Sequence, residues 1–168
     1  MADLKISELS FRYARRNEFS RAREMMLETA SANLRFAVSP PRTAEQVRFE
    51  VDEVWSDCYE PWAAKGLIRF LFAIYQREPV ALSVFGPRNP NRRETPGFIF
   101  AFGVKSGMRG LGIGKTLLAE SLRRLKSLGY QQAALALYID NFAAKKLYQG
   151  AGFKAEQMTM VYDLNDLV

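Results

Sequence analysis

Residues 109–116, Arg-Gly-Leu-Gly-Ile-Gly-Lys-Thr, form a glycine-rich segment between two stretches of different periodicity. The apolar residues 98–104 before it predict a strand, and residues 115–128 after it predict an amphipathic helix. Glycine permits positive φ angles and a close approach of the backbone to a ligand, and a helix start offers unpaired N–H groups. The segment therefore predicts a phosphate-binding turn between a strand and a helix.

The positions of the glycines distinguish three kinds of phosphate-binding turn. A P-loop needs glycine five positions before Gly114-Lys115-Thr116, but Arg109 stands there. The P-loop hypothesis keeps some support from Asp140, which follows an apolar run. A dinucleotide fingerprint, counted from either of the first two glycines, places Lys115 or Leu117 at its third glycine. The pattern that remains is R-x-x-G-x-G leading into a helix.

This pattern resembles the pyrophosphate-binding motif of the GNAT acyltransferase superfamily, whose members use acetyl-CoA. A second motif, Asn-Phe-Ala-Ala-Lys-Lys-Leu-Tyr at residues 141–148 followed by Gly152-Phe153, resembles the superfamily's N-x-x-A-x-x-x-Y and G-F signature. The resemblance covers residues 67–164. It implies an α/β fold with a mixed, mostly antiparallel central sheet flanked by helices on both faces, and a single GNAT-like domain over residues 1–168.

The periodicity along the chain is consistent with such a fold. Thr43 to Gln46 predict a capping box, Pro61 and Gly66 are expected to end the helix that follows it, and Gly129 is expected as a left-handed cap. Residues 86–97, rich in proline, asparagine and arginine, predict an exposed, mobile loop. Strands are expected at residues 4–13, 67–75, 80–85, 98–104, 132–138 and 153–164, and helices at 18–32, 43–58, 115–128 and 141–149.

The resemblance implies a binding site for acetyl-CoA around the turn. Backbone N–H groups and the helix start would hold the pyrophosphate, and the end of the preceding strand would pair with the pantetheine arm and face the thioester carbonyl. The family often has an acidic residue and a proline where this chain has Lys105 and Ser106. The alternative is that the glycines only allow a tight turn to pack. The residues implied in binding are Phe102, Gly103, Val104, Arg109, Gly110, Leu111, Gly112, Ile113, Gly114, Lys115, Thr116, Asn141, Ala144 and Tyr148.

The second motif supplies the catalytic candidate. By resemblance, Asn141 would bond the pantetheine arm, and Tyr148 would donate its phenolic proton to the departing thiolate. A phenol with a pKa near 10 stays protonated at neutral pH, which suits this role. The alternatives are a helix N-cap for Asn141 and a core aromatic for Tyr148.

A general base is harder to identify, because the chain has no histidine and residues 98–104 hold no carboxylate. Residues 49–64 carry five acidic residues and no Lys or Arg, and in the family the helices before the central hairpin line the acceptor pocket. Together with Trp55, Tyr59 and Trp62, the acidic residues would favour a cationic amine acceptor. The alternative is the solvated face of an amphipathic helix. The candidates for a base acting through water are Glu53, Asp57 and Glu60.

Composition limits the remaining possibilities. The net charge of +6 comes from basic residues that are spread along the chain, without a zinc-ligand pattern or an RNA-binding signature, so neither nucleic acid nor a metal is expected as a partner. The chain has no run of 18 apolar residues and no signal-like N-terminus, and its one cysteine, Cys58, cannot form an internal disulfide. We expect a cytoplasmic protein with no membrane contact, and a homodimer remains open.

These observations predict an acetyl-CoA-dependent N-acetyltransferase. It would transfer an acetyl group to a primary amine of a small molecule or peptide, by direct attack of the amine on the thioester. Two alternatives are a non-catalytic acyl-CoA-binding module, which would keep the turn but lack turnover, and a P-loop NTPase.

Overall fold

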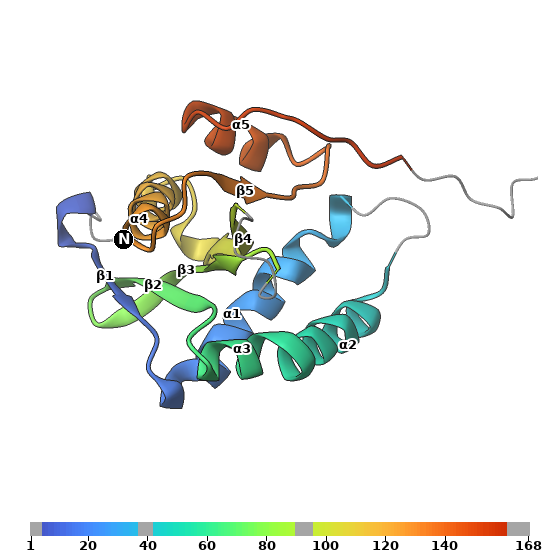
Figure 1. The fold of residues 1–168 in the computed structure, drawn as a ribbon, viewed down its shortest axis with the longest axis horizontal. Coiled ribbons are helices and arrows are strands. Elements are labelled where there is room, and N and C mark those ends of the chain that lie inside the picture. The colour runs from blue at the N-terminus through green and yellow to red at the C-terminus, as the bar shows by residue number, and fades with distance from the viewer. Residues whose placement is uncertain (1–4, 37–41, 90–95, 161–168) are drawn as a thin grey trace, which may run out of the picture.

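The computed structural model describes residues 5–36, 42–89 and 96–160. Within these residues the central sheet contains five strands in the order β1-β2-β3-β4-β5 (Figure 1). Neighbouring strands from β1 to β4 are antiparallel, and β5 is parallel to β4. The expected mixed, mostly antiparallel sheet is thus confirmed. The strands are β1 (Ser10–Tyr13), β2 (Arg69–Tyr75), β3 (Glu78–Pro87), β4 (Gly97–Val104) and β5 (Ala133–Leu135).

Helices cover both faces of the sheet, as expected (Figure 1). On one face, α1 and the helical segment of α2 and α3 enclose a core that includes Met25, Phe70 and Phe72. On the other face, α4 and α5 enclose a core that includes Leu71 and Leu118. Because both faces are covered, β2 and β3 are buried along nearly their whole length, and apart from Ser83 their interiors are apolar without alternation. The helices are α1 (Phe19–Ala32), α2 (Ala44–Val54), α3 (Glu60–Ala64), α4 (Ile113–Ser127) and α5 (Phe142–Gly150).

The second helical segment begins as predicted but ends later. Thr43 and Gln46 form the capping box, with Oγ1 of Thr43 accepting from the Gln46 amide at 3.1 Å. A π-helical turn, Trp55–Tyr59, then joins α2 directly to α3, and Pro61 lies in the first turn of α3. Pro61 does not end the helix, because proline is tolerated in a first helical turn, where its missing N–H is not needed. Gly66, with a φ of 70°, follows the end of α3.

Several predicted boundaries differ from the structure. Only residues 10–13 of the opening run form a strand, because Ile6–Glu8 is a 3₁₀ turn. The run 132–138 forms a strand only over three residues, and β3 extends to Pro87. Residues 153–160 form no strand, since no described strand pairs with them, and residues 161–164 lie outside the described part of the chain. Residue 4, the prolines at 40 and 41 and the central half of the predicted 86–97 loop, residues 90–95, also lie outside it.

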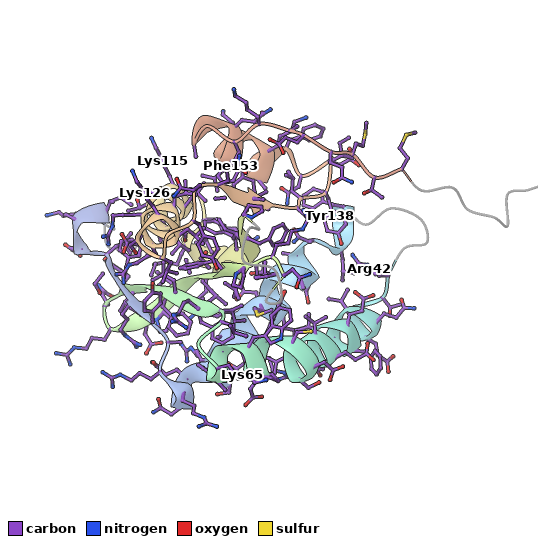
Figure 2. All side chains as sticks on the ribbon, in the orientation of Figure 1. Arg42, Lys65, Lys115, Lys126, Tyr138 and Phe153 are labelled. Atoms are coloured by element: carbon purple, nitrogen blue, oxygen red, sulfur yellow. The ribbon has the colours of Figure 1, made fainter. Side chains whose placement is uncertain are left out.

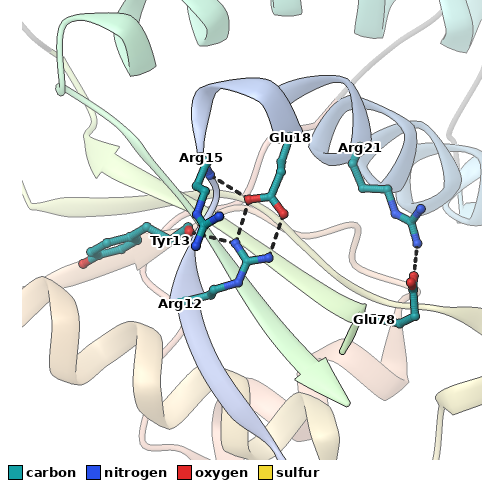
Figure 3. Close-up of polar contacts among 6 residues, drawn as sticks. All are labelled: Arg12, Tyr13, Arg15, Glu18, Arg21 and Glu78. Carbon is teal, nitrogen blue, oxygen red and sulfur yellow. Dashed lines mark hydrogen bonds and ion pairs between the residues drawn. The ribbon is translucent and has the colours of Figure 1, made fainter. Parts of the chain in front are cut away.

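An ion-pair cluster fixes the entry into α1 (Figure 3). The Arg12 guanidinium donates to both Glu18 carboxylate oxygens at 2.7 Å, and the Arg15 amide donates to the same carboxylate at 2.9 Å. These donors, led by Arg12, lower the pKa of Glu18 to about 2. Arg21 in the first turn of α1 pairs with Glu78 of β3 at 2.5 Å. The cluster orients α1, whose C-terminal half reaches the candidate site described below.

Candidate active site

Strands β4 and β5 separate part-way along the sheet, and this leaves one edge of β4 open. The two strands pair only from Gly97 to Ile99, whereas β4 continues to Val104 in register with β3. The register shifts between Val84 and Phe85, so Phe100 is an extra residue, a β-bulge, in β4. Among the described residues no strand pairs with the other edge of residues 100–104. Except for the Val104 carbonyl, which accepts from the Arg109 side chain, their outward N–H and C=O groups are available to an extended ligand.

The glycine-rich turn follows this open edge. Gly110 and Gly112 have φ angles of 78° and 81°, and α4 begins directly after Gly112. Within the described chain, no oxygen accepts from the amides of residues 110–115. Thr116, in contrast, donates both its amide and its hydroxyl to the Gly112 carbonyl at 3.2 Å. Free amides are therefore present over residues 110–115. The predicted cluster is shorter than expected, because the Arg109 amide donates to the Ser106 carbonyl at 3.4 Å and the Thr116 amide donates to Gly112.

Arg109 contributes in a way that the sequence did not predict. Its Nε donates to the Val104 carbonyl at 3.0 Å, so the side chain folds back and closes the loop between β4 and the turn. Leu111 is exposed and does not reach the cleft described next.

A cleft of about 420 Å³ runs along the open edge of β4 and past the turn. Its walls come from the end of α1, from β4, from the turn and from α5. Residues from both sequence motifs therefore meet in one cleft, and two of them, Arg109 and Lys115, are cationic. The predicted cofactor residues that line it are Phe102, Gly103, Val104, Arg109, Gly110, Gly112, Ile113, Gly114, Lys115, Asn141, Ala144 and Tyr148.

A second cavity, of about 560 Å³, lies between the sheet, α1, α2 and the connection from β5 to α5. The helices before the central hairpin line it, as the sequence led us to expect. The cleft and the cavity meet, because six residues line both: Thr29, Asn33, Phe102, Asn141, Ala144 and Tyr148.

Tyr148 lies at this junction. Its side chain packs edge-on against Phe102 and Phe153, with ring centroids 6.0 and 5.8 Å away, and the residue is 8% exposed. Burial raises the pKa of Tyr148 to about 12. No hydrogen-bond partner for its hydroxyl lies within the described residues. The core packing foreseen as an alternative is present, and it leaves a protonated phenol facing the two spaces.

Asn141 is the N-cap of α5. Its Oδ1 accepts from the Ala144 amide at 3.1 Å, which agrees with the capping alternative. Its Nδ2 donates to Oδ1 of Asn33 at the end of α1, 3.3 Å away. This bond joins the two walls of the cleft. Contact between Asn141 and the pantetheine arm stays a prediction.

Gly103 also allows α1 to approach β4 closely. A Cβ at this position would collide with Oγ1 of Thr29, because α1 crosses β4 closely here. Thr29 itself is fixed, since its hydroxyl donates to the Met25 carbonyl at 2.9 Å. Nothing in the local sequence indicated this contact.

The structure places the three predicted base candidates away from the cavity. Glu53, Asp57 and Glu60 are exposed, and none lines either space. Glu60 accepts from Nε1 of Trp55 at 3.2 Å, and Asp57 accepts from Ser56 at 3.1 Å. Their positions match the alternative interpretation, in which they form the solvated face of a helix.

The aromatic residues of this segment have different positions. Trp55 is buried and stacks on Phe70, with ring centroids 5.1 Å apart, so it belongs to the core. Trp62 packs against Phe100. Tyr59 lines the cavity, and burial raises its pKa to about 12. Of the three, only Tyr59 is placed to contact a ligand there.

A different carboxylate of the segment, Glu50, does line the cavity. Glu50 pairs with Arg42 at 2.6 Å. Arg42 also donates to the hydroxyl of Tyr138, and its guanidinium lies 5.8 Å from the centroid of that ring. Figure 2 shows Arg42 and Tyr138 approaching each other, Arg42 from the segment just before α2 and Tyr138 from the connection after β5. No local pattern in the sequence indicated this bridge, because Arg42 and Tyr138 lie 96 positions apart.

Among the described residues, no group of three or more His, Cys, Asp or Glu side chains is arranged to hold a metal ion. None of the helices there combines the length and the apolar character that crossing a membrane requires.

Comparison with known proteins places these features in a family. A family model described as "Acetyltransferase (GNAT) family" matches residues 33–153. A mycothiol acetyltransferase of Geodermatophilus obscurus is 30% identical over 111 residues, which make up 66% of this chain and 34% of that protein. The chain thus spans about a third of the length of that relative.

Solved structures share the fold. The structure of YycN from Bacillus subtilis has a TM-score of 0.75 and 20% identity, over 93% of this chain and 98% of that one. The PaiA N-acetyltransferase of Thermoplasma acidophilum, in complex with coenzyme A, has a TM-score of 0.72 and 18% identity, over 90% and 92% of the two chains.

Proposed function

Because the chain belongs to the GNAT acetyltransferase family, we propose that it transfers an acetyl group from acetyl-CoA to a primary amine of a small molecule or peptide. One observation carries this proposal: the cleft with the free amides and the second cavity meet at Tyr148. One space would hold the cofactor and the other the acceptor. The reacting groups would then come together where the two spaces join.

The cleft suits a long ligand that carries phosphate groups. The free amides of residues 110–115, at the positive end of the α4 dipole, would hold the pyrophosphate, and Lys115 adds a cation beside them. The open edge of residues 100–104 would pair with the amides of the pantetheine arm. The Arg109 side chain stays with the Val104 carbonyl and supports the loop.

The residues at the junction support direct transfer. The bound thioester supplies the activated acetyl group. The neutral amine nitrogen attacks the thioester carbon, so that a C–N bond forms and the C–S bond breaks, and the proton lost by nitrogen passes to water. Tyr148 donates its hydroxyl proton to the departing sulfur and regains a proton from solvent. Its raised pKa keeps this proton in place at neutral pH.

Turnover tests the proposal against the non-catalytic alternative. The purified chain is incubated with acetyl-CoA and a panel of amines, free thiol is measured, and products are identified by mass spectrometry. Calorimetry with CoA is run on the same preparation. We expect binding of CoA and amine-dependent release of thiol. Binding without release would favour an acyl-CoA-binding module, and no binding would refute both. Family membership argues against the P-loop NTPase, which calorimetry with ATP and magnesium would test directly.

A further inference from the structure

We propose, on the basis of the function proposed above, that the acceptor is a primary amine on an apolar body, such as an arylalkyl or alkyl monoamine. The cavity of about 560 Å³ that adjoins Tyr148 would hold it. The Glu50 carboxylate would attract the ammonium group as it enters at the edge of the cavity, before the nitrogen loses its proton and reaches the junction at Tyr148.

The walls of the cavity are mainly apolar, and they come from four parts of the fold. Among the described residues that line it there is no Lys, Arg or Asp, and Glu50 is the one carboxylate. An acceptor that carries many hydroxyl or ammonium groups would lose its hydrogen bonds to water on entering this cavity, and the apolar walls would not replace them. The apolar lining residues are Met26, Ala30, Val51, Val54, Ile99, Ala101, Phe102, Leu135, Ala136 and Leu137.

Most polar side chains that line the cavity already have hydrogen-bond partners within the protein. Thr29 donates to the Met25 carbonyl, and Asn33 and Asn141 bond to each other. The Tyr138 hydroxyl accepts from Arg42. This leaves the hydroxyls of Tyr59 and Tyr148, of which the second is assigned to the departing thiolate. The lining therefore offers few free side-chain groups that could recognise a sugar or a polyamine.

The same walls would help to produce the neutral amine that the reaction needs. Transfer of an ammonium group into apolar surroundings lowers its pKa, because the charged form loses solvation. The phenols of Tyr59, which is half-buried, and Tyr148, which is buried, lie in such surroundings, since desolvation raises the pKa of both. Proton loss from the acceptor then needs no histidine, and the chain has none.

Glu50 is positioned to attract one positive charge and not several. Its side chain is 45% exposed, so it meets an incoming ligand at the solvent side. Arg42 contacts it at 2.6 Å and is itself held by Tyr138. A second ammonium group on the acceptor would find no other carboxylate in the lining and would lie near the Arg42 guanidinium. Monoamines are therefore favoured over polyamines.

The rates at which the full chain acetylates three different amines, measured with saturating acetyl-CoA, test this assignment. The rate of thiol release is measured for 2-phenylethylamine, spermidine and glucosamine, and each product is confirmed by mass spectrometry. We expect kcat/KM for 2-phenylethylamine to exceed both others by roughly 10-fold or more, the scale at which apolar pockets discriminate. Equal or faster acetylation of glucosamine or spermidine would overturn the inference.

Two pairs of variants test whether Glu50 and the apolar wall of the cavity determine the choice of acceptor. Glu50→Gln should raise KM for 2-phenylethylamine several-fold with little change in kcat, whereas Glu45→Gln, exposed on the same helix, should change neither. Val54→Asp adds a charge to the wall and should lower kcat/KM for 2-phenylethylamine, whereas Phe49→Asp, exposed and outside the lining, should not. Equal behaviour within each pair would contradict the assigned roles of Glu50 and Val54.

Failure of this inference can be distinguished from failure of the proposed function. If the chain binds CoA and acetylates only polar amines, acetyl transfer stands and the apolar acceptor is refuted. If CoA binds and no amine in the panel is acetylated, the apolar acceptor is refuted as well. If CoA does not bind and no thiol is released, the proposed function fails, and the inference fails with it.

Discussion

Tyr148 packs edge-on against Phe102, with ring centroids 6.0 Å apart and ring planes at 72°, and both side chains line both the cleft and the cavity. Phe102 belongs to the open edge of β4, and Tyr148 belongs to the helix capped by Asn141. The pair therefore connects the two sequence motifs at the point where their spaces join.

Replacing Tyr148 by Phe should slow turnover and leave cofactor binding intact. The variant keeps the ring packing and removes the proton donor, so kcat should fall by about 100-fold or more. The Kd for CoA, measured by calorimetry, should change by less than about twofold, because pyrophosphate binding is assigned to main-chain amides. Tyr130→Phe is the matched control, since Tyr130 lines neither space. An unchanged kcat in Tyr148→Phe would exclude this acid role.

The pH dependence of kcat should show no loss of the acid up to about pH 10. Burial favours the neutral phenol and raises the pKa of Tyr148 to about 12, so the proton remains bound well above the ordinary pKa near 10. Steady-state rates at saturating substrates between about pH 7 and pH 10 provide the measurement. A decline with an apparent pKa near 10, present in the native chain and absent from Tyr148→Phe, would contradict the assignment.

Replacing Gly112 by Ala should weaken CoA binding and destabilise the fold. Gly112 has a φ of 81°, and a Cβ in this region costs about 1–2 kcal/mol. Any relaxation would turn the amides of the α4 start away from the ligand. Gly107→Ala is the control, because a Cβ there meets no atom within 4 Å and the position needs no positive φ. Denaturant unfolding and CoA calorimetry on both variants provide the comparison, and equal effects would refute the role of this conformation.

Replacing Gly103 by Ala should destabilise the chain through its contact with Thr29. The added methyl would collide with Oγ1 of Thr29, at a cost of about 1–3 kcal/mol in the free energy of unfolding. Thr29→Ala removes that oxygen and should recover part of the loss in the double variant. A double-mutant cycle measures this coupling. Strictly additive effects would show that the two residues do not meet as described.

The local parts of the site were predictable from the sequence. Three features depend on residues only a few positions apart: the positive φ of Gly112, the cap at Asn141 and the amphipathic pattern of α4. The structure agrees with all three. The hairpin of β2 and β3 was predictable for the same reason. Its turn residues, Gln76 and Arg77, both adopt positive φ angles.

Features that depend on distant contacts were not predictable. Glu50 faces the cavity while Glu53 faces solvent, and only the packing of α2 decides between them. The bonds from Asn33 to Asn141 and from Arg42 to Tyr138 join residues about a hundred positions apart, which no local pattern reveals. Alternation over residues 153–160 favoured a strand, but a strand also needs a neighbour, and the described chain provides none.

A crystal structure of the chain with CoA is the most direct test of the central claim, that main-chain groups beside the open edge of β4 bind the cofactor. The account predicts the pyrophosphate within about 3 Å of the amides of residues 110–115, the pantetheine arm along residues 100–104, and the sulfur directed toward Tyr148. A complex in which CoA lies elsewhere, with those amides bonded only to water or to protein, would contradict the account.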